Sequence, residues 1–147
     1  MSAGVARFTS VCMSTGEFKG IENIRKSEIF QCYRLDSKEF DIMTGEVESL
    51  GITRSLVFID LEYRGVGCLQ QKTLMITPDT KFILVDGTIK KASELQRHDE
   101  LLCETLKNVF VRKLTIIDSP TEIYRIKFRE DNDNIAMVST LGVVLLA

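Results

Sequence analysis

The stretch LMITPDTKFILVDGTIKKASELQRHDELL, residues 74–102, decides the fold of this chain. Its apolar residues fall at nearly alternate positions, which is the period of a strand with one buried face: Ile76, Phe82, Leu84 and Ile89. Asp86-Gly87 interrupts this pattern, and glycine accepts a positive φ because it has no Cβ to clash. The stretch therefore predicts a β-hairpin that turns at Asp86-Gly87.

The residues on either side of this hairpin extend the prediction. Ala92 to Leu95 predicts a single helical turn, and Leu101-Leu102 begins the next strand. In front of the hairpin, Thr77-Pro78-Asp79-Thr80 forms a loop where a rigid sheet could hold a catalytic group. The predicted order is strand, turn, strand, helical turn, strand.

Length and composition indicate a small globular protein built from strands. The 147 residues suit one domain, residues 1–147, and a hydrophobic content of 44% can fill a core. β-Branched and aromatic residues come in short runs separated by turn residues, which favours an all-β fold. The net charge of −2 is mixed along the chain, so no nucleic-acid partner is expected. The longest apolar run, residues 141–147, is too short to cross a bilayer, and no signal peptide is present, so no membrane partner is expected.

The cysteines do not form a metal-binding pattern. Cys12, Cys32, Cys68 and Cys103 are scattered, without a CxxC pair, so zinc binding is not expected. They are expected to be free, buried thiols in a reducing compartment. The sequence contains no phosphate-binding loop, metal cluster or Ser-His-Asp arrangement, and no cofactor is expected.

Outside the central stretch, apolar runs predict further short strands. These are expected at residues 7–13, 28–34, 40–44, 55–59, 109–111, 114–117, 123–128 and 141–146. Gly45 is expected to end the strand that begins at Phe40. Residues 129–134, the most polar segment, should form an exposed hairpin tip.

The chain also contains an internal repeat with an offset of 71 residues, which pairs Gly16 with Gly87. The other pairs are Ala6 with Thr77, Met13 with Leu84, Phe18 with Ile89, Lys19 with Lys90, Ile24 with Leu95, Glu28 with Asp99, Phe30 with Leu101 and Cys32 with Cys103. Two related halves would each expose an apolar sheet face alone, and would bury it by interlocking. Chance similarity between two amphipathic β segments is the alternative.

The central stretch resembles the hedgehog/intein (Hint) family. That family usually carries Thr-x-x-His, then an apolar pair, then Asp-Gly, and later Glu-Leu, Gly-Asp and a leucine. The positions that fit are Thr77, Phe82, Asp86, Gly87, Glu94, Leu95, Asp99 and Leu102. Thr80 stands where the family has its histidine, and His98 where it usually has glycine. The resemblance implies an all-β, Hint-like horseshoe of two pseudosymmetric interlocked halves, in agreement with the repeat.

The resemblance extends to the start of the chain. Ala3-Gly4, Phe8 and Ile21-x-x-Ile24 fit the family's opening motif. This register puts Met1 at the position of the nucleophilic cysteine.

The end of the chain is also similar to this family. The segment EIYRIKFREDNDNIAMVSTLGVVLLA, residues 122–147, matches the closing motifs of inteins in its strands and polar turn. Within it Arg125 replaces an aspartate, Leu146 the penultimate histidine and Ala147 the final asparagine.

The resemblance implies self-splicing, a reaction for which this chain lacks the groups. A first Cys or Ser attacks the preceding carbonyl, the Thr-x-x-His loop activates that amide, and a final Asn cyclises with help from the penultimate His. Met1 has no nucleophile, and Thr80 has no proton to exchange near neutral pH. Leu146 is neither acid nor base, and Ala147 does not cyclise. Thr77 is retained, and is expected to be a hydrogen-bonding residue at a strand end.

The only histidine and the first cysteine do not replace these groups. His98 lies between Arg97 and Asp99 on a polar turn, and is expected to be a solvated loop residue. Cys12 would be the nucleophile only in an alternative register that deletes the first strand.

These losses predict a catalytically degenerate, intein-like domain that acts as a structural or protein-interaction module. A protein partner is expected, in an assembly such as a virus or phage particle, and the protein is expected in the cytoplasm or in a particle assembled there. The losses fit a natural descendant that kept the fold and lost splicing. The alternative is an intein-type splicing or autoprocessing element in an inactivated form, trimmed and mutated at its ends. Val143 and Leu145, or their neighbours Val144 and Leu146, are expected to be buried on one face of the C-terminal strand, beside the first strand around Phe8.

Overall fold

The computed structural model describes residues 3–65, 72–104, 107–130 and 133–146, which are mostly strands. The elements in chain order are β1 (Val5–Ala6), β2 (Ser10–Cys12), β3 (Phe18–Gly20), the 3₁₀ turn η1 (Ile21–Asn23), β4 (Glu28–Arg34), β5 (Glu39–Tyr63), β6 (Lys72–Ile76), β7 (Lys81–Ile83), β8 (Ile89–Lys91), η2 (Ala92–Glu94), β9 (Val109–Phe128), β10 (Ile135–Val138), η3 (Thr140–Gly142) and β11 (Val144–Leu146). The all-β class predicted from the sequence is confirmed.

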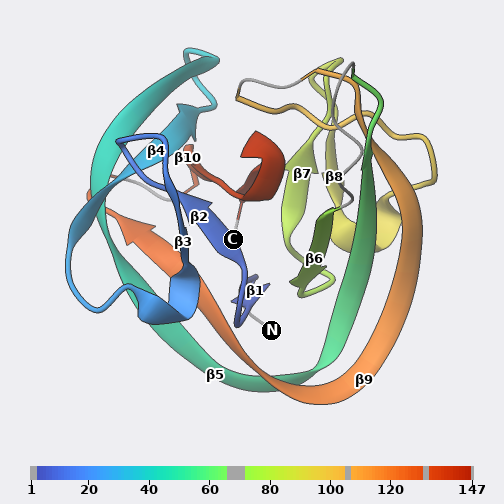
Figure 1. The fold of residues 1–147 in the computed structure, drawn as a ribbon, viewed down its shortest axis with the longest axis horizontal. Helices are drawn as coiled ribbons and strands as arrows, with labels where there is room; N and C mark the ends of the chain where they lie inside the picture. The colour runs from blue at the N-terminus through green and yellow to red at the C-terminus, as the bar shows by residue number, and fades with distance from the viewer. Residues whose placement is uncertain (1–2, 66–71, 105–106, 131–132, 147) are drawn as a thin grey trace.

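Two long curved strands, β5 and β9, give the molecule its shape. They pair antiparallel from Gly45 opposite Phe128 to Tyr63 opposite Val109. Figure 1 shows both strands sweeping under the other strands as a horseshoe, with both ends of the chain between its arms. The sheet order β6-β1-β9-β5-β4-β10-β11-β7-β8 places the shorter strands along these arms.

The length of these strands differs from the short segments that the sequence predicted. Gly45 lies inside β5, where an added Cβ would come within 2.9 Å of Ile126 Cγ2, so glycine allows the two strands to approach closely. The three segments predicted within residues 109–128 are one strand, β9. The β5–β9 pairing continues through three register shifts, at Ser49/Gly51, Thr53/Ser55 and Asp60/Leu61.

The 71-residue repeat corresponds to two pseudosymmetric halves. β2, β3 and η1 recur, residue for residue, as β7, β8 and η2. Gly16 and Gly87, which turn the two hairpins, both have a φ of +90°. Each half carries an ion pair between its hairpin and the residues that follow: Lys19–Glu28 at 3.2 Å and Lys90–Asp99 at 3.1 Å. The repeat is therefore structural, and not a chance similarity.

The two halves interlock and share a core. β1 of the first half pairs with β6 and β9 of the second, and β5 pairs with the same two strands. The largest fully buried side chains come from both halves: Phe30, Phe82, Ile21, Leu56, Ile59, Leu61, Leu74, Ile76, Leu101, Ile126, Leu145 and Val5. Because strand partners lie in opposite halves, neither half alone can cover these side chains.

The C-terminal strand β11 lies inside the sheet. It pairs with β10 on one side and with β7 on the other. Val143, Val144 and Leu145 are fully buried, as the sequence predicted. The predicted neighbour was wrong, because Phe8 is 74% exposed. β1 ends at Ala6 and the chain then turns, which leaves Phe8 at a φ of +74° outside any strand.

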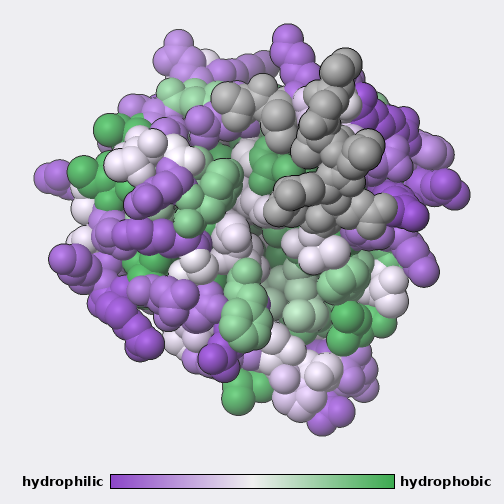
Figure 2. Space-filling view, viewed as in Figure 1, coloured by the Kyte–Doolittle hydropathy of each residue, from purple (hydrophilic) through white to green (hydrophobic). Residues whose placement is uncertain are grey.

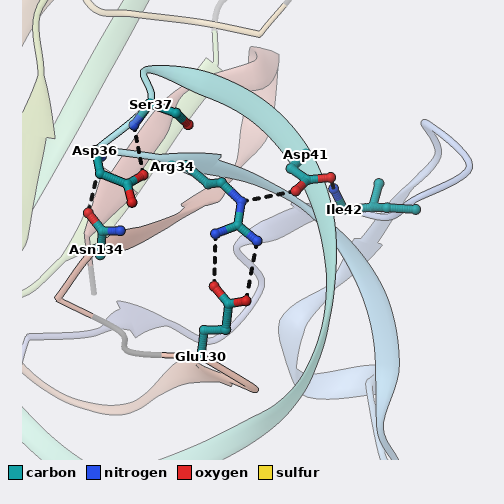
Figure 3. A network of polar contacts seen from close by, with 7 residues as sticks. All are labelled: Arg34, Asp36, Ser37, Asp41, Ile42, Glu130 and Asn134. Carbon is teal, nitrogen blue, oxygen red and sulfur yellow. Dashed lines mark hydrogen bonds and ion pairs between the residues drawn. The ribbon is translucent and has the colours of Figure 1, made fainter.

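A polar network ties the β4–β5 hairpin to the segment that follows β9. Arg34 Nε lies 3.0 Å from Asp41 Oδ2, and the two terminal nitrogens of Arg34 reach the Glu130 carboxylate at 2.8 and 3.4 Å (Figure 3). The amide of Asp36 donates to Asn134 Oδ1 at 3.1 Å. The hairpin is thus held by side chains as well as by strand pairing.

Parts of the sequence prediction fall outside the described residues. Residues 131–132 of the predicted hairpin tip are among them, although Arg129 and Glu130 beside them are exposed as predicted. The other predicted positions outside the described residues are Met1, Cys68 and Ala147.

Candidate functional site

The candidate site is the loop from Thr77 to Thr80, which joins β6 to β7. Both threonine residues are fully buried. β6 ends just before Thr77 and β7 begins just after Thr80, so two strands of the sheet fix the positions of the hydroxyls. β1 runs antiparallel to β6 with Val5 opposite Ile76, and this register brings Gly4 beside Thr77.

The two threonines bind the backbone of Gly4. The Gly4 amide donates to Oγ1 of Thr77 at 3.0 Å and to Oγ1 of Thr80 at 3.2 Å. The Gly4 carbonyl accepts from Thr80 Oγ1 at 3.0 Å and from the Thr77 amide at 3.0 Å. The two hydroxyl oxygens lie 2.9 Å apart, which closes a buried ring of hydrogen bonds.

The number of protons in this ring limits its chemistry. Each threonine hydroxyl has one proton to donate. Thr80 gives its proton to the Gly4 carbonyl, so Thr77 must be the donor in the contact between the hydroxyls. No hydroxyl proton is left over, and neither hydroxyl titrates near neutral pH. The ring can position a peptide, but it supplies no general acid or base.

On its other side, Gly4 faces β9. Extending the pairing of Val5 with Tyr124 by one residue places Gly4 across from Arg125. An added Cβ on Gly4 would lie 3.0 Å from the Tyr124 carbonyl oxygen, so a glycine fits closely. Arg125 Nε lies 2.7 Å from Glu48 Oε2, and this hydrogen bond lowers the pKa of Glu48. The side chain of Arg125 is therefore paired with a carboxylate of β5.

The C-terminal strand reaches the same loop. Leu146 pairs with Lys81, which directly follows Thr80. Gly4 and Leu146 thus approach Thr80 from opposite ends of the chain. Leu146 is partly buried and packs on a small apolar cluster, so no titratable side chain stands at the position where the resemblance implies a histidine.

The described cysteines are not activated nucleophiles. Cys12 lies in β2 opposite Phe18 of β3, and burial raises the pKa of its thiol to about 11. Burial also raises the thiol pKa of Cys32 to about 11 and that of Cys103 to about 12. Thiols with such pKa values are almost wholly protonated at neutral pH. All three are free and buried, as predicted.

His98 is exposed, as predicted, and lies away from the threonine loop. Its Nδ1 is 2.9 Å from Nη2 of Arg64. Its φ of +76° is unusual for a residue with a Cβ, which explains why glycine suits this position. Within the described parts of the chain, no group of three His, Cys, Asp or Glu residues could hold a metal ion. No helix among these residues is long and apolar enough to span a membrane.

Sequence reasoning missed the place of Gly4. It named Gly4 only as part of the opening motif, and did not predict that the Gly4 amide binds Thr77 and Thr80. Only the register of β1 against β6 brings Gly4 to the loop, and that register depends on tertiary pairing. Thr9, in contrast, could have been found as the counterpart of Thr80, because the 71-residue offset pairs them.

Comparison with solved structures identifies the fold. The chain matches an intein-like domain from Clostridium thermocellum with a TM-score of 0.76 and 23% sequence identity, over 99% of this chain and 98% of that one. It matches a DnaB intein from Synechocystis with a TM-score of 0.76 and 16% identity, over 99% of both chains. The TvoVMA intein matches with a TM-score of 0.69 and 17% identity, over 97% of this chain and 96% of that one. No protein-family model and no curated protein sequence matches. The chain thus has the Hint-like fold of inteins, as the resemblance predicted.

Proposed function

We propose that this chain is a catalytically degenerate Hint-fold domain that acts as a structural or protein-interaction module. One observation carries the proposal. The loop that corresponds to Thr-x-x-His binds the Gly4 peptide through two threonine hydroxyls, and no titratable side chain takes part in these hydrogen bonds. A loop of this kind stabilises a strand end, whereas cleavage of an amide needs a proton donor for the leaving nitrogen.

The residue held by the loop also lacks a nucleophile. In a splicing reaction, the residue whose amide the loop binds must attack the carbonyl before it. Here that residue is Gly4, which has no side chain. On the register read from sequence the position falls on Met1, which has no nucleophile either.

The second junction supports the same conclusion. Leu146 and Ala147 stand where the resemblance implies the histidine and asparagine of C-terminal cleavage. Arg125 stands in place of an aspartate and is paired with Glu48. Each of these replacements removes an acid, a base or a nucleophile, and none introduces another.

The proposal gives the retained fold a binding role. The interlocked sheet is a rigid platform, and we infer a protein partner that binds it within an assembly such as a virus or phage particle in the cytoplasm. Fold and function separate readily, so a site that has lost its chemistry is compatible with an intact fold.

The test is a fusion of this chain between two reporter domains, with an active intein in the same reporters as the positive control. Mass spectrometry after long incubation should find the fusion intact. Cleaved or ligated products whose yield falls in a Thr77→Ala variant would contradict the proposal.

The alternative is an intein-type splicing element in an inactivated form. The observation in its favour is that Gly4 and Leu146 both lie next to the Thr77–Thr80 loop, which is the arrangement that joining two flanking segments requires. The parent coding sequence separates the two proposals. Flanking host-protein segments, with Cys or Ser at the first junction and Asn at the second, would favour the alternative.

A further inference from the structure

Three cationic side chains line an open hollow on the outer arm of β9. The hollow has a volume of about 560 Å³ and is lined by Arg97, Arg112, Lys113 and Leu114. At the upper right of Figure 2, over the part of β9 that Figure 1 draws there, the surface is hydrophilic. The cations are concentrated here although the chain as a whole has a net charge of −2.

The backbone around the hollow is fixed before any ligand arrives. The turn that carries Arg97 is bonded to β9 by the His98 amide, which donates to the Val111 carbonyl at 2.8 Å, and by the Val111 amide, which donates to the Asp99 carbonyl at 2.9 Å. On β9, a register shift opposite Asp60 and Leu61 makes Arg112 the extra residue of a bulge. Bulges re-aim side chains, so Arg112 and its neighbour Lys113 both reach the hollow.

The positive charge of the hollow is only partly balanced. Asp60 lies opposite Lys113 in the sheet, and its Oδ2 is 4.0 Å from Nη1 of Arg112. Neither Arg97 nor Lys113 forms an ion pair with another described residue. Arg64, which forms an ion pair with Glu62, lowers the pKa of the Glu62 carboxyl, and so does Arg112. The three cations of the hollow thus face Asp60 and a Glu62 carboxylate that already has a cationic partner.

We propose that this hollow binds an acidic segment of a partner protein. Two guanidinium groups and one ammonium match carboxylates, because each arginine can donate two parallel hydrogen bonds to one of them. Leu114 adds an apolar wall for the stem of a glutamate or for a neighbouring apolar side chain. The volume is that of sites holding ligands of several groups, roughly 300–1,000 Å³, and exceeds what one inorganic ion needs. The inference rests on the proposed interaction role and names the chemistry of the partner.

The test measures binding of a fluorescently labelled hexaglutamate peptide to the full chain, with a hexaglutamine peptide as the neutral probe. The test variant is Arg97→Gln with Lys113→Gln, since neither side chain forms an ion pair with another described residue. The matched control is Arg25→Gln with Lys26→Gln, which removes the same two kinds of charge from an exposed loop elsewhere. Both double variants therefore have the same net charge.

The hexaglutamate peptide should bind, and the hexaglutamine peptide should not. Binding should weaken by about tenfold or more in the Arg97/Lys113 variant, and by less than about twofold in the control. Raising the NaCl concentration from about 0.05 M to about 0.5 M should abolish binding of hexaglutamate, because salt shortens the distance over which charges attract one another.

Three results would overturn the proposal. The first is that hexaglutamate does not bind, and the second is that both double variants weaken its binding equally. The third is that inorganic phosphate displaces hexaglutamate at a concentration no higher than that of the peptide. The peptide assay is independent of the reporter fusion. A chain that splices and binds the peptide refutes the proposed function alone, and a chain that does neither refutes the acidic-partner proposal alone.

Discussion

Thr80 occupies the place in the second half of the chain that Thr9 occupies in the first, 71 residues earlier. The amide of each bonds the carbonyl three residues before it, at 3.2 Å for Thr9 and 3.1 Å for Thr80. The two threonine hydroxyls bind different partners. Thr9 Oγ1 donates to the Ala6 carbonyl at 2.7 Å within its own loop, whereas Thr80 Oγ1 donates to Gly4 in the other half. The threonine hydroxyl of one copy of the repeated loop therefore joins the two halves, and that of the other copy does not.

Replacing Thr80 by valine should destabilise the fold by about 1–3 kcal/mol, because the buried Gly4 carbonyl loses a donor and the Thr77 hydroxyl loses its acceptor. Thr9→Val removes a single local hydrogen bond and should cost about 1 kcal/mol. Urea unfolding at neutral pH measures both free energies. Equal costs would argue against a joining role for Thr80.

Gly16→Ala and Gly87→Ala should destabilise the fold equally. Both glycines have a φ of +90°, and no atom lies within 4 Å of an added Cβ at either position. The cost therefore comes from the backbone alone, at about 1–2 kcal/mol each. Thermal or urea unfolding of the two variants measures it, and clearly unequal costs would contradict the equivalence of the two hairpins.

The Arg34 network should make stability depend on acid pH. The hydrogen bond from Arg34 holds the pKa of Asp41 below its usual value, and bonds to Asn134 and the Ser37 amide lower the pKa of Asp36. A carboxylate with a lowered folded pKa stabilises the fold above its unfolded pKa of about 3.9, and this contribution is lost as pH falls through the folded value.

An Arg34→Gln variant removes the largest cause of the Asp41 shift. The variant should be less stable than the natural chain at neutral pH, and the difference should shrink as pH falls below about 4. Urea midpoints across this pH range measure the difference. A gap that stays constant would mean that Arg34 acts through packing and not through charge.

The buried cysteines should resist alkylation in the folded chain. Iodoacetamide reacts with the thiolate form of cysteine. At about pH 8, thiols with pKa values of about 11 (Cys12 and Cys32) and about 12 (Cys103) are almost entirely protonated, so little thiolate is present. Peptide mass mapping should show these three sites modified only after denaturant is added. Because the folded pKa values lie above the unfolded ones, the fold should lose stability as pH rises past about 9. Rapid labelling of Cys103 in the native chain would contradict its burial.

The two halves should not fold apart. Fragments 1–71 and 72–147 each lack some of the strands that pair with their own. β1 pairs with β6 and β9, and β5 pairs with these two strands as well as with β4 of its own fragment. Circular dichroism should show each fragment unfolded alone, with β structure gained on mixing. Cooperative melting of an isolated fragment would show instead that one half is self-sufficient.

The sequence by itself determined the local structure and the symmetry of this protein. Asp86-Gly87 and Gly16 marked the hairpin turns, because a positive φ is a local demand that glycine meets. The 71-residue offset was visible because both halves repeat the same spacing of glycine, apolar and charged residues. The residues at the positions where the resemblance implies histidines, Thr80 and Leu146, could likewise be read directly, since the lack of a titratable group is a property of the residue itself.

Only the tertiary structure decided which residues the Thr77–Thr80 loop binds and how far the long strands extend. Gly45 has the local character of a strand end, yet β5 continues through it because β9 lies close enough to require a residue without a Cβ. Gly4 reaches Thr77 through the pairing of β1 with β6, two strands that are far apart in the chain. Strand register over such separations is set by which apolar faces can be buried together, and a one-residue slip would turn every side chain to the opposite face.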